Sequence, residues 1–290
     1  MIRAATVLDI PEIKKIWDQS FDDPLNYVDF LFDKVMDPND TLVYEEEGEI
    51  VSMAMSIYCS FRYHDDSIPC VYIYGCATRP DKGGRGLMTE LISCVESNAL
   101  ARDCQMAVLV PGNRSLFRFY GKRGYNPDFS LRRVQLRSGM LETVPRPEVA
   151  IEYDRLFSDD FHEIREKALY EIPHIEWRSD QLDFMTADAL AYEDHIASYS
   201  GESGKAYAIY SLKKRAMFIR EILGTSEESG TMLLAGLVDE QNPKRVSMNL
   251  PVGGGILPFE GRNMIYGMSK SFKTAKPMSS LEPYMNLMLD

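Results

Sequence analysis

The sequence predicts an α/β (α+β) fold with two similar halves, each a mixed, mostly antiparallel twisted sheet flanked by helices. An apolar strand at 72–78 enters a glycine-rich turn, and apolar residues then recur at helical spacing from Leu87 to Ala99. Short apolar segments before this strand are joined by polar turns, which is typical of an antiparallel meander. The second half repeats the order hairpin, helix, strand.

The first half reads as β-α-α-β-β-β-α-β-α. Proline at position 11 suits the first turn of a helix, which we expect to run through Trp17. A second helix follows at 25–36, and the helix after Gly86 covers the sheet. The expected strands are 2–6, 41–44, 50–55, 68–78, 105–111 and, completing the sheet, 129–136.

A proline-containing segment at 142–148 is the best candidate boundary, giving domains at 1–140 and 148–290. The second half has its own expected elements, namely a strand at 151–153, helices at 159–170 and 231–238, an aromatic-containing segment around Trp177, a hairpin at 206–211 and 215–223, and a strand at 246–250. No Gly-x-Gly follows its hairpin, so we expect no cofactor site there.

The charge and the apolar residues exclude several classes of protein. A formal net charge of −12 disfavours nucleic-acid binding, which normally needs a basic face. The sequence contains no run of about 18 apolar residues, so it predicts no membrane span. The start of the chain lacks the features of a signal peptide. We therefore expect a cytoplasmic protein that binds neither nucleic acid nor membrane.

The cysteines and histidines predict neither a disulfide framework nor a metal site. The cysteines are odd in number and lie in apolar segments without Cys-x-x-Cys spacing, so they read as small buried hydrophobes. They are Cys59, Cys70, Cys76, Cys94 and Cys104. The histidines, His64, His162, His174 and His195, are scattered without ligand spacing, so no metal is expected.

The turn after the strand at 72–78 predicts an anion site. Its glycines let a phosphate approach the unpaired N–H groups at the start of a helix, and Lys82 and Arg85 add positive charge. The spacing matches neither the P-loop nor the dinucleotide-binding fingerprint. Coenzyme A is therefore favoured over nucleoside triphosphates and dinucleotides as the ligand of this turn.

The pattern Gly83-Gly84-Arg85-Gly86 resembles the acetyl-CoA pyrophosphate loop of the GNAT superfamily of N-acetyltransferases, Gln/Arg-x-x-Gly-x-Gly/Ala. Gly86 matches, whereas Gly83 and Met88 depart from the pattern. The later run from Asn113 through Tyr120 to Gly124-Tyr125 looks like the second GNAT signature, Asn-x-x-Ala-x-x-Leu-Tyr-x-x-x-Gly-Phe. The weaker likeness of the second half suggests a degenerate GNAT-like domain, similar to acetyltransferases of the enhanced-intracellular-survival type.

This resemblance implies acetyl-CoA-dependent N-acetylation of a primary amine by direct attack. A tyrosine is a suitable acid for the departing thiolate, and Tyr120 occupies the matching position. The strand backbone at Cys76, Ala77 and Thr78 would hold the pantetheine arm, and the loop would hold the pyrophosphate. The cofactor-binding residues that the resemblance implies are Cys76, Ala77, Thr78, Lys82, Gly83, Gly84, Arg85, Gly86, Leu87, Met88 and Asn113.

The acceptor and the general base stay open. Asp22 and Asp23 could meet a protonated amine or form a helix cap and turn. Because the strand at 68–78 has no carboxylate, the candidate bases are Asp22, Asp23, His64, Glu260 and Asp290. A small-molecule amine is favoured over a protein lysine, and homo-oligomers are left open. The alternative is a non-catalytic acyl-CoA sensor or a partner-interaction protein, which the departures at Gly83 and Met88 would suit.

Overall fold

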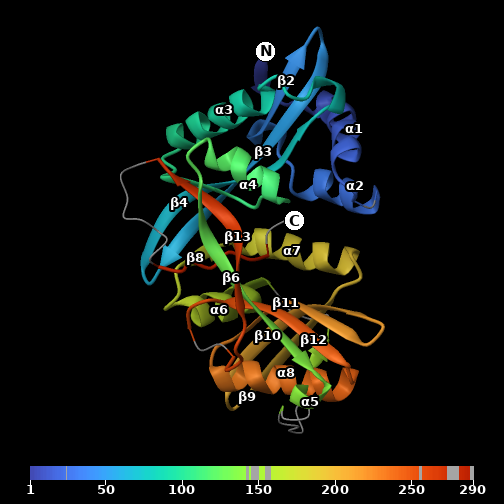
Figure 1. Ribbon diagram of the computed structural model, residues 1–290, viewed down its shortest axis with the longest axis vertical. Helices are drawn as coiled ribbons and strands as arrows, with labels where there is room; N and C mark the ends of the chain where they lie inside the picture. Colours follow the sequence, from blue (N-terminus) through green and yellow to red (C-terminus); the bar gives the residue numbers. More distant parts are fainter. Residues whose placement is uncertain are drawn as a thin grey trace. The chain divides into compact units, whose positions relative to one another are not determined.

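The structure is a computed structural model that describes residues 1–23, 25–141, 144, 150–153, 158–254, 257–272 and 281–287 (Figure 1). The chain divides into two compact units, and each is discontinuous in sequence. The first contains Met1–Ser60, Ser67–Asn126 and Met268–Lys276; the second contains Phe61–Asp66, Pro127–Gly267 and Pro277–Asp290. The domain limits 1–140 and 148–290 stay a prediction about the sequence.

The sheet of the first unit has the strand order β1-β2-β3-β4-β5-β13. Its strands are β1 (Ile2–Ala4), β2 (Thr41–Glu46), β3 (Glu49–Tyr63), β4 (Asp66–Thr78), β5 (Met106–Leu109) and the end of β13 (Arg262–Ser271). The pair β4 and β5 is parallel, whereas β2 pairs with β1 and with β3 in antiparallel fashion. This arrangement confirms the mixed, mostly antiparallel fold that the sequence predicts.

Helices cover both faces of this sheet (Figure 1). They are α1 (Ile10–Ser20), α2 (Leu25–Lys34), α3 (Leu87–Ala101) and α4 (Arg114–Gly121), with short 3-10 turns at Val7–Asp9, Pro38–Asp40 and Pro80–Lys82. Apolar residues of α3 and α4 pack on one face with Val71 and Ile73 of β4. On the other face, Trp17 of α1 contacts Tyr74, with ring centroids 5.6 Å apart.

The strand next to β5 differs from the expected one. The segment 129–136, expected to complete the first sheet, belongs to β6 (Asn126–Arg137) and pairs with β12 (Arg245–Pro251) in the second unit. Met268–Ser271 of β13 instead pairs antiparallel with Met106–Leu109. Because β5 is buried along its whole length, it needs a partner on this side, and a strand distant in sequence provides it.

The second unit has the strand order β6-β12-β11-β10-β9-β7. Its further elements are β7 (Glu152–Tyr153), β8 (His174–Glu176), β9 (His195–Gly201), β10 (Gly204–Lys213), β11 (Ala216–Gly224), α5 (Ser138–Leu141), α6 (Ser158–Leu169), α7 (Ser179–Ala191) and α8 (Glu227–Gln241). The antiparallel pair β10 and β11 leads through α8 to β12, which lies parallel to β11. This confirms the predicted order of hairpin, helix and strand, and it repeats the order β3-β4-α3-β5.

Candidate active site

The turn between β4 and α3 leaves the start of a helix open. Gly86 is the N-cap residue of α3, and no side chain caps the helix. Gly84 and Gly86 have left-handed backbones, with φ of 76° and 87°, and no atom lies within 4 Å of the position where a Cβ would stand on either. The first amide groups of a helix lack intrahelical partners, so this turn can accept an anion.

The corresponding turn of the second unit is closed by its own side chains. Ser226 caps α8, its Oγ accepting a hydrogen bond from the Ser229 amide at 3.0 Å. A Cβ on Gly224 would lie 2.6 Å from the Gly230 nitrogen and 2.7 Å from the Ser229 Oγ. The α8 turn therefore lacks the space that the α3 turn offers, and a side chain already occupies one of its amides.

The two cations of the α3 turn are held by one carboxylate. Arg85 donates to both oxygens of Glu46, at 2.7 and 2.8 Å, and the Lys82 Nζ lies 3.4 Å from Glu46 Oε2. The hydrogen bonds from Arg85 hold the pKa of Glu46 below its usual range. The sequence placed Lys82 and Arg85 at the anion site but did not indicate Glu46, which is the last residue of β2.

Gly75 changes the alternation of side chains along β4. Its backbone is left-handed, with φ of 58°. Val71 and Ile73 belong to the core under α3 and α4, and the next residue of β4 packed against this core is Cys76 rather than residue 75. One extra residue in a strand shifts all later side chains to the other face. The irregularity at Gly75 therefore turns Cys76 toward α4.

Tyr120 of α4 meets Cys76 at this point. The tyrosine is buried, with 6% of its surface exposed, and its hydroxyl is hydrogen-bonded to the Cys76 thiol. Burial raises the pKa of Tyr120 well above its ordinary range and raises the pKa of the Cys76 thiol to about 12. Both groups are therefore protonated at neutral pH, and the tyrosine hydroxyl lies beside a sulfur atom.

The end of β4 extends beyond its pairing with β5. Their register joins Cys70–Tyr72 to Met106–Val108, whereas β4 continues to Thr78. Ser52 of β3 donates to the Ala77 carbonyl oxygen at 2.8 Å, and its hydroxyl lies 2.7 Å from the Thr78 Oγ1. The backbone of the residues expected to hold the pantetheine arm thus lies beyond the paired part of the two strands, anchored from the β3 side.

Asn113 and the residues after Tyr120 support α4. The Asn113 side-chain oxygen Oδ1 caps the helix, accepting hydrogen bonds from the backbone amides of Ser115 and Leu116 at 3.0 and 3.2 Å. Arg123 joins α4 to α3 by donating to Thr89 Oγ1 at 3.1 Å. The structure therefore gives the Asn113 carbonyl group a structural contact where the resemblance implied a cofactor contact.

The two residues proposed to bind the acceptor amine, Asp22 and Asp23, have different surroundings. Asp23 accepts a hydrogen bond from the Trp17 indole N–H at 2.9 Å, whereas Asp22 is exposed. Close by, the hydroxyls of Tyr27 and Tyr74 are 2.9 Å apart. Asp23 thus helps to fix Trp17 in an aromatic cluster, and Asp22 keeps an exposed carboxylate.

The other candidate bases lie outside the first unit or outside the described residues. His64 belongs to the second unit, where its ring packs against Tyr170 with centroids 5.1 Å apart and its Nδ1 lies 3.8 Å from Glu171. Glu260 is exposed in the same unit. Asp290 lies outside the described residues, so its role as a base stays a prediction.

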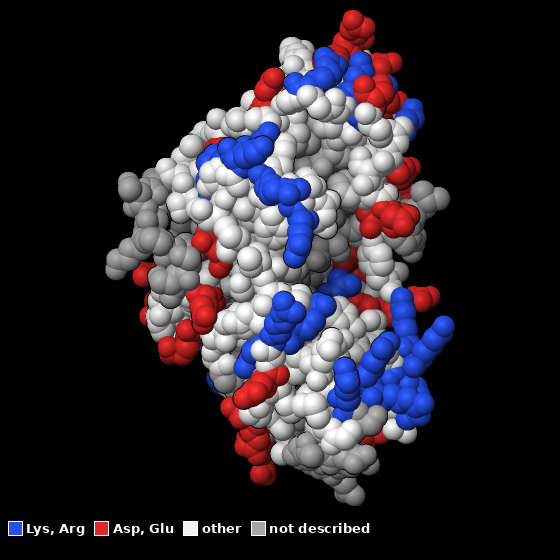
Figure 2. All heavy atoms as spheres, in the orientation of Figure 1, with Lys and Arg blue, Asp and Glu red and all other residues white. Residues whose placement is uncertain are grey.

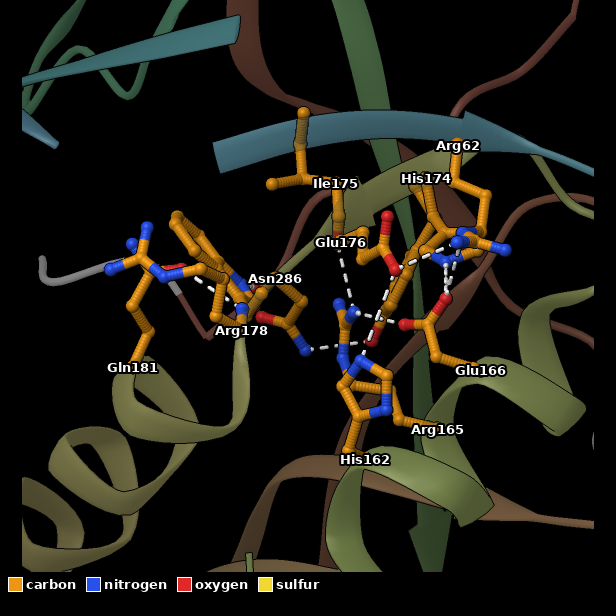
Figure 3. A network of polar contacts seen from close by, with 12 residues as sticks. Arg62, His162, Arg165, Glu166, His174, Ile175, Glu176, Arg178, Gln181 and Asn286 are labelled. Carbon is orange, nitrogen blue, oxygen red and sulfur yellow. Dashed lines mark hydrogen bonds and ion pairs between the residues drawn. The ribbon is translucent and has the colours of Figure 1, made fainter. Parts of the chain in front are cut away.

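The second unit also brings together polar residues that the sequence did not connect (Figure 3). Ligand atoms of His162, Glu166 and Glu176 all lie within 4.8 Å of one another, although the histidines showed no ligand spacing. His162 and Glu166 are one helical turn apart on α6, and this spacing was the available signal. Arg62 lies 3.0 Å from Glu176 and 3.5 Å from Glu166, so a cation from the protein already balances both carboxylates.

A buried ion pair lies beneath this cluster. The Arg165 Nε lies 3.4 Å from Glu221, both side chains are fully buried, and Arg165 also donates to the Ile175 carbonyl at 2.8 Å. Tyr284, near the end of the chain, donates to Glu221 at 2.6 Å. The network thereby fixes the described segment 281–287 within the second unit.

Comparisons with known proteins concern the family of the first unit and the fold. Residues 1–127 match the family model described as an acetyltransferase (GNAT) domain. No curated protein matches the sequence. None of the helices in the described parts of the chain has the length and apolar character that crossing a membrane requires.

Three solved structures share the fold. A probable N-acyltransferase from Enterococcus faecalis V583 is 15% identical, with a TM-score of 0.75, covering 93% of this chain and 72% of that one. A GCN5-related N-acetyltransferase from Kribbella flavida is 16% identical, with a TM-score of 0.72 and coverage of 97% and 72%. Eis1 from Mycobacterium abscessus is 13% identical, with a TM-score of 0.72 and coverage of 93% and 73%.

Proposed function

From the premise that residues 1–127 form an acetyltransferase domain of the GNAT family, we propose that the protein transfers an acetyl group from acetyl-CoA to a primary amine. One observation carries this proposal: β4 leads directly into the uncapped start of α3, and the same strand presents Cys76 to the hydroxyl of Tyr120. The site for a phosphate group thus follows the same strand that faces a proton donor on α4.

The residues at this site fit acetyl-CoA. Acetyl-CoA would supply an activated acetyl thioester. The amides of Gly83–Met88 would hold its pyrophosphate, with Lys82 and Arg85 beside them once Glu46 releases these cations. The backbone of Cys76–Thr78, beyond the paired part of β4 and β5, would hold the pantetheine arm. Leu87 is buried and Met88 packs against the core, so these two contribute backbone rather than side chains.

Tyr120 would act at the thioester sulfur. Its hydroxyl already hydrogen-bonds to a sulfur-bearing side chain, the thiol of Cys76. Because burial raises the pKa of Tyr120, the phenol holds its proton and stabilises a developing thiolate chiefly through a hydrogen bond. Cys76 holds its own proton at neutral pH and is no competing nucleophile.

We propose a small-molecule amine as the acceptor, with Asp22 as the carboxylate that meets its positive charge. Asp22 is exposed, whereas Asp23 is engaged by Trp17. An exposed carboxylate attracts an ammonium group and leaves the removal of its proton to water or to another group. Substitution of Asp22 by Asn is therefore expected to raise KM for the amine more than it lowers kcat.

The test is release of the CoA thiol from acetyl-CoA with a panel of aminoglycosides, polyamines, amino acids and lysine peptides. Tyr120→Phe should lower turnover about 10²-fold or more while acetyl-CoA affinity is kept. Tyr125→Phe is the matched control, because Tyr125 is also a buried tyrosine but hydrogen-bonds to Glu96 at 2.9 Å instead of to a thiol. Binding of acetyl-CoA without release of the CoA thiol in the presence of any amine would favour the acyl-CoA sensor. Equal turnover in Tyr120→Phe and the unsubstituted protein would contradict the role of Tyr120 as the acid.

A further inference from the structure

One end of the sheet in the second unit carries a group of exposed cations, here called the hairpin-end basic surface. It consists of Arg137, Lys213, Lys214, Arg215, Lys244 and Arg245. Figure 2 shows Lys and Arg side chains gathered at the lower right, over the ends of β10, β11 and β12. A chain with a net charge of −12 thus concentrates positive charge at one place.

The strand register places three of these residues, Arg137, Arg245 and Lys213, in one row. Arg137 of β6 is directly opposite Arg245 of β12. Arg245 in turn pairs with Ala216 of β11, which pairs with Lys213 of β10. Neighbouring strands lie about 4.8 Å apart, so the row from Arg137 to Lys213 is about 15 Å long.

The tip of the hairpin holds two cations in an unfavourable backbone conformation. Lys214 and Arg215 form the two-residue loop between the paired residues Lys213 and Ala216, with φ of 50° and 62°. Asn-Gly is the preferred pair in such a loop, because a left-handed backbone costs other residues about 1–2 kcal/mol each. The chain therefore accepts backbone strain where it presents these two charges.

Further contacts fix the charges in place and add repulsion between them. Like charges directly opposite on neighbouring strands, as Arg137 and Arg245 are, destabilise a sheet. The Arg215 guanidinium donates to the Asn242 carbonyl at 2.8 and 2.9 Å, and the Lys244 amide donates to the Arg215 carbonyl at 2.8 Å. The repulsion between these charges is relieved when an anion binds there.

We propose that the hairpin-end basic surface docks a short acidic segment of a partner protein. The row of about 15 Å matches about five residues of an extended peptide. A long polyanion such as nucleic acid would continue past the row, where a chain of net charge −12 repels it. A short segment with several carboxylates meets the cations without meeting that repulsion.

Fluorescence anisotropy with labelled peptides of alternating Glu and Gly, four, eight and sixteen residues long, tests this proposal on the full chain. Affinity should rise from four to eight residues and change less than about twofold from eight to sixteen. It should fall about tenfold or more between 50 and 300 mM salt, because exposed charges are screened. A peptide with Gln in place of Glu should not bind.

The decisive variant is Lys214→Asn with Arg215→Gly, which gives the turn its preferred residues while it removes two charges. Its melting temperature should stay equal or rise, and its affinity for the eight-residue peptide should fall about three- to tenfold. The control, Lys167→Asn with Arg178→Asn, removes two exposed cations of the same unit that lie outside the surface.

Several outcomes would overturn the proposal. If the turn variant binds the peptide as tightly as the unsubstituted protein, or if the control variant loses as much affinity as the turn variant, the peptide is attracted by overall charge alone. Tighter binding of a 30-nucleotide single-stranded DNA than of the acidic peptides would assign the surface to nucleic acid. No binding of any acidic peptide at 50 mM salt would remove the docking site.

Discussion

Substitution of Gly75 by Ala tests the irregularity that turns Cys76 toward Tyr120. A left-handed backbone costs a residue with a Cβ about 1–2 kcal/mol. The new Cβ would also stand 2.8 Å from the Cζ3 of Trp17, a side chain that is 1% exposed and therefore cannot move aside freely. Overpacking of this kind costs about 1–3 kcal/mol, so the two effects together predict a loss of about 2–5 kcal/mol.

The chain offers a matched control in Gly48. Its φ of 83° is also left-handed, but no atom lies within 4 Å of its Cβ position. Gly48→Ala should therefore show the backbone cost alone, about 1–2 kcal/mol. At about 2–4 °C per kcal/mol, Gly75→Ala should lower Tm by about 4–20 °C and Gly48→Ala by about 2–8 °C.

Thermal unfolding followed by circular dichroism measures both variants, and acetyl-CoA titration provides a second readout. Acetyl-CoA affinity should fall in Gly75→Ala, because β4 must shift to relieve the contact with Trp17, and should stay unchanged in Gly48→Ala. Equal Tm losses in the two variants would refute the steric part of the reasoning. An unchanged acetyl-CoA affinity in Gly75→Ala would show that the irregularity does not shape the site.

Three further predictions concern charged groups. Glu46→Gln should tighten acetyl-CoA binding about two- to fivefold by releasing the cations of the α3 turn, whereas the exposed Glu47→Gln should not; isothermal titration distinguishes them. Arg165→Met should cost about 3–5 kcal/mol in chemical denaturation, because Glu221 is left buried without its cation, and adding Glu221→Gln should recover most of this loss. Arg3 holds the pKa of Asp9 well below its usual range, so this carboxylate adds stability above about pH 4 that is lost as pH falls; the Tm difference between Asp9→Asn and the unsubstituted protein should shrink on acidification.

Local pattern was sufficient for most elements of the fold. Apolar spacing and the glycine turn predicted α3, observed at Leu87–Ala101, and two neighbouring segments at 206–211 and 215–223 predicted the hairpin that forms β10 and β11. Each of these elements has an apolar face made of its own residues. The pattern that predicts it therefore lies within a few consecutive residues. The partner of β5 had no such signal, because the pairing of Met268–Ser271 depends on residues far away in sequence.

The same limit applies to the candidate site. The motifs indicated the α3 turn and Tyr120, because glycines and a tyrosine at fixed spacing can be recognised within a short stretch of sequence. Contacts between elements decided the rest: Glu46 reaches Arg85 from another strand, and Trp17 engages Asp23. Which carboxylate is exposed and which is engaged depends on packing, and one sequence does not record packing between distant segments.

The start of α8 carries a capping side chain that stabilises the helix, whereas the start of α3 lacks such a cap and is open to a ligand. A capping side chain such as Ser226 contributes about 0.5–2 kcal/mol to its helix, and α3 forgoes that contribution at Gly86. A bound anion would return it, since a ligand stabilises the state that binds it. Saturation with CoA is therefore expected to slow hydrogen exchange in the first turn of α3 and to leave the first turn of α8 unchanged.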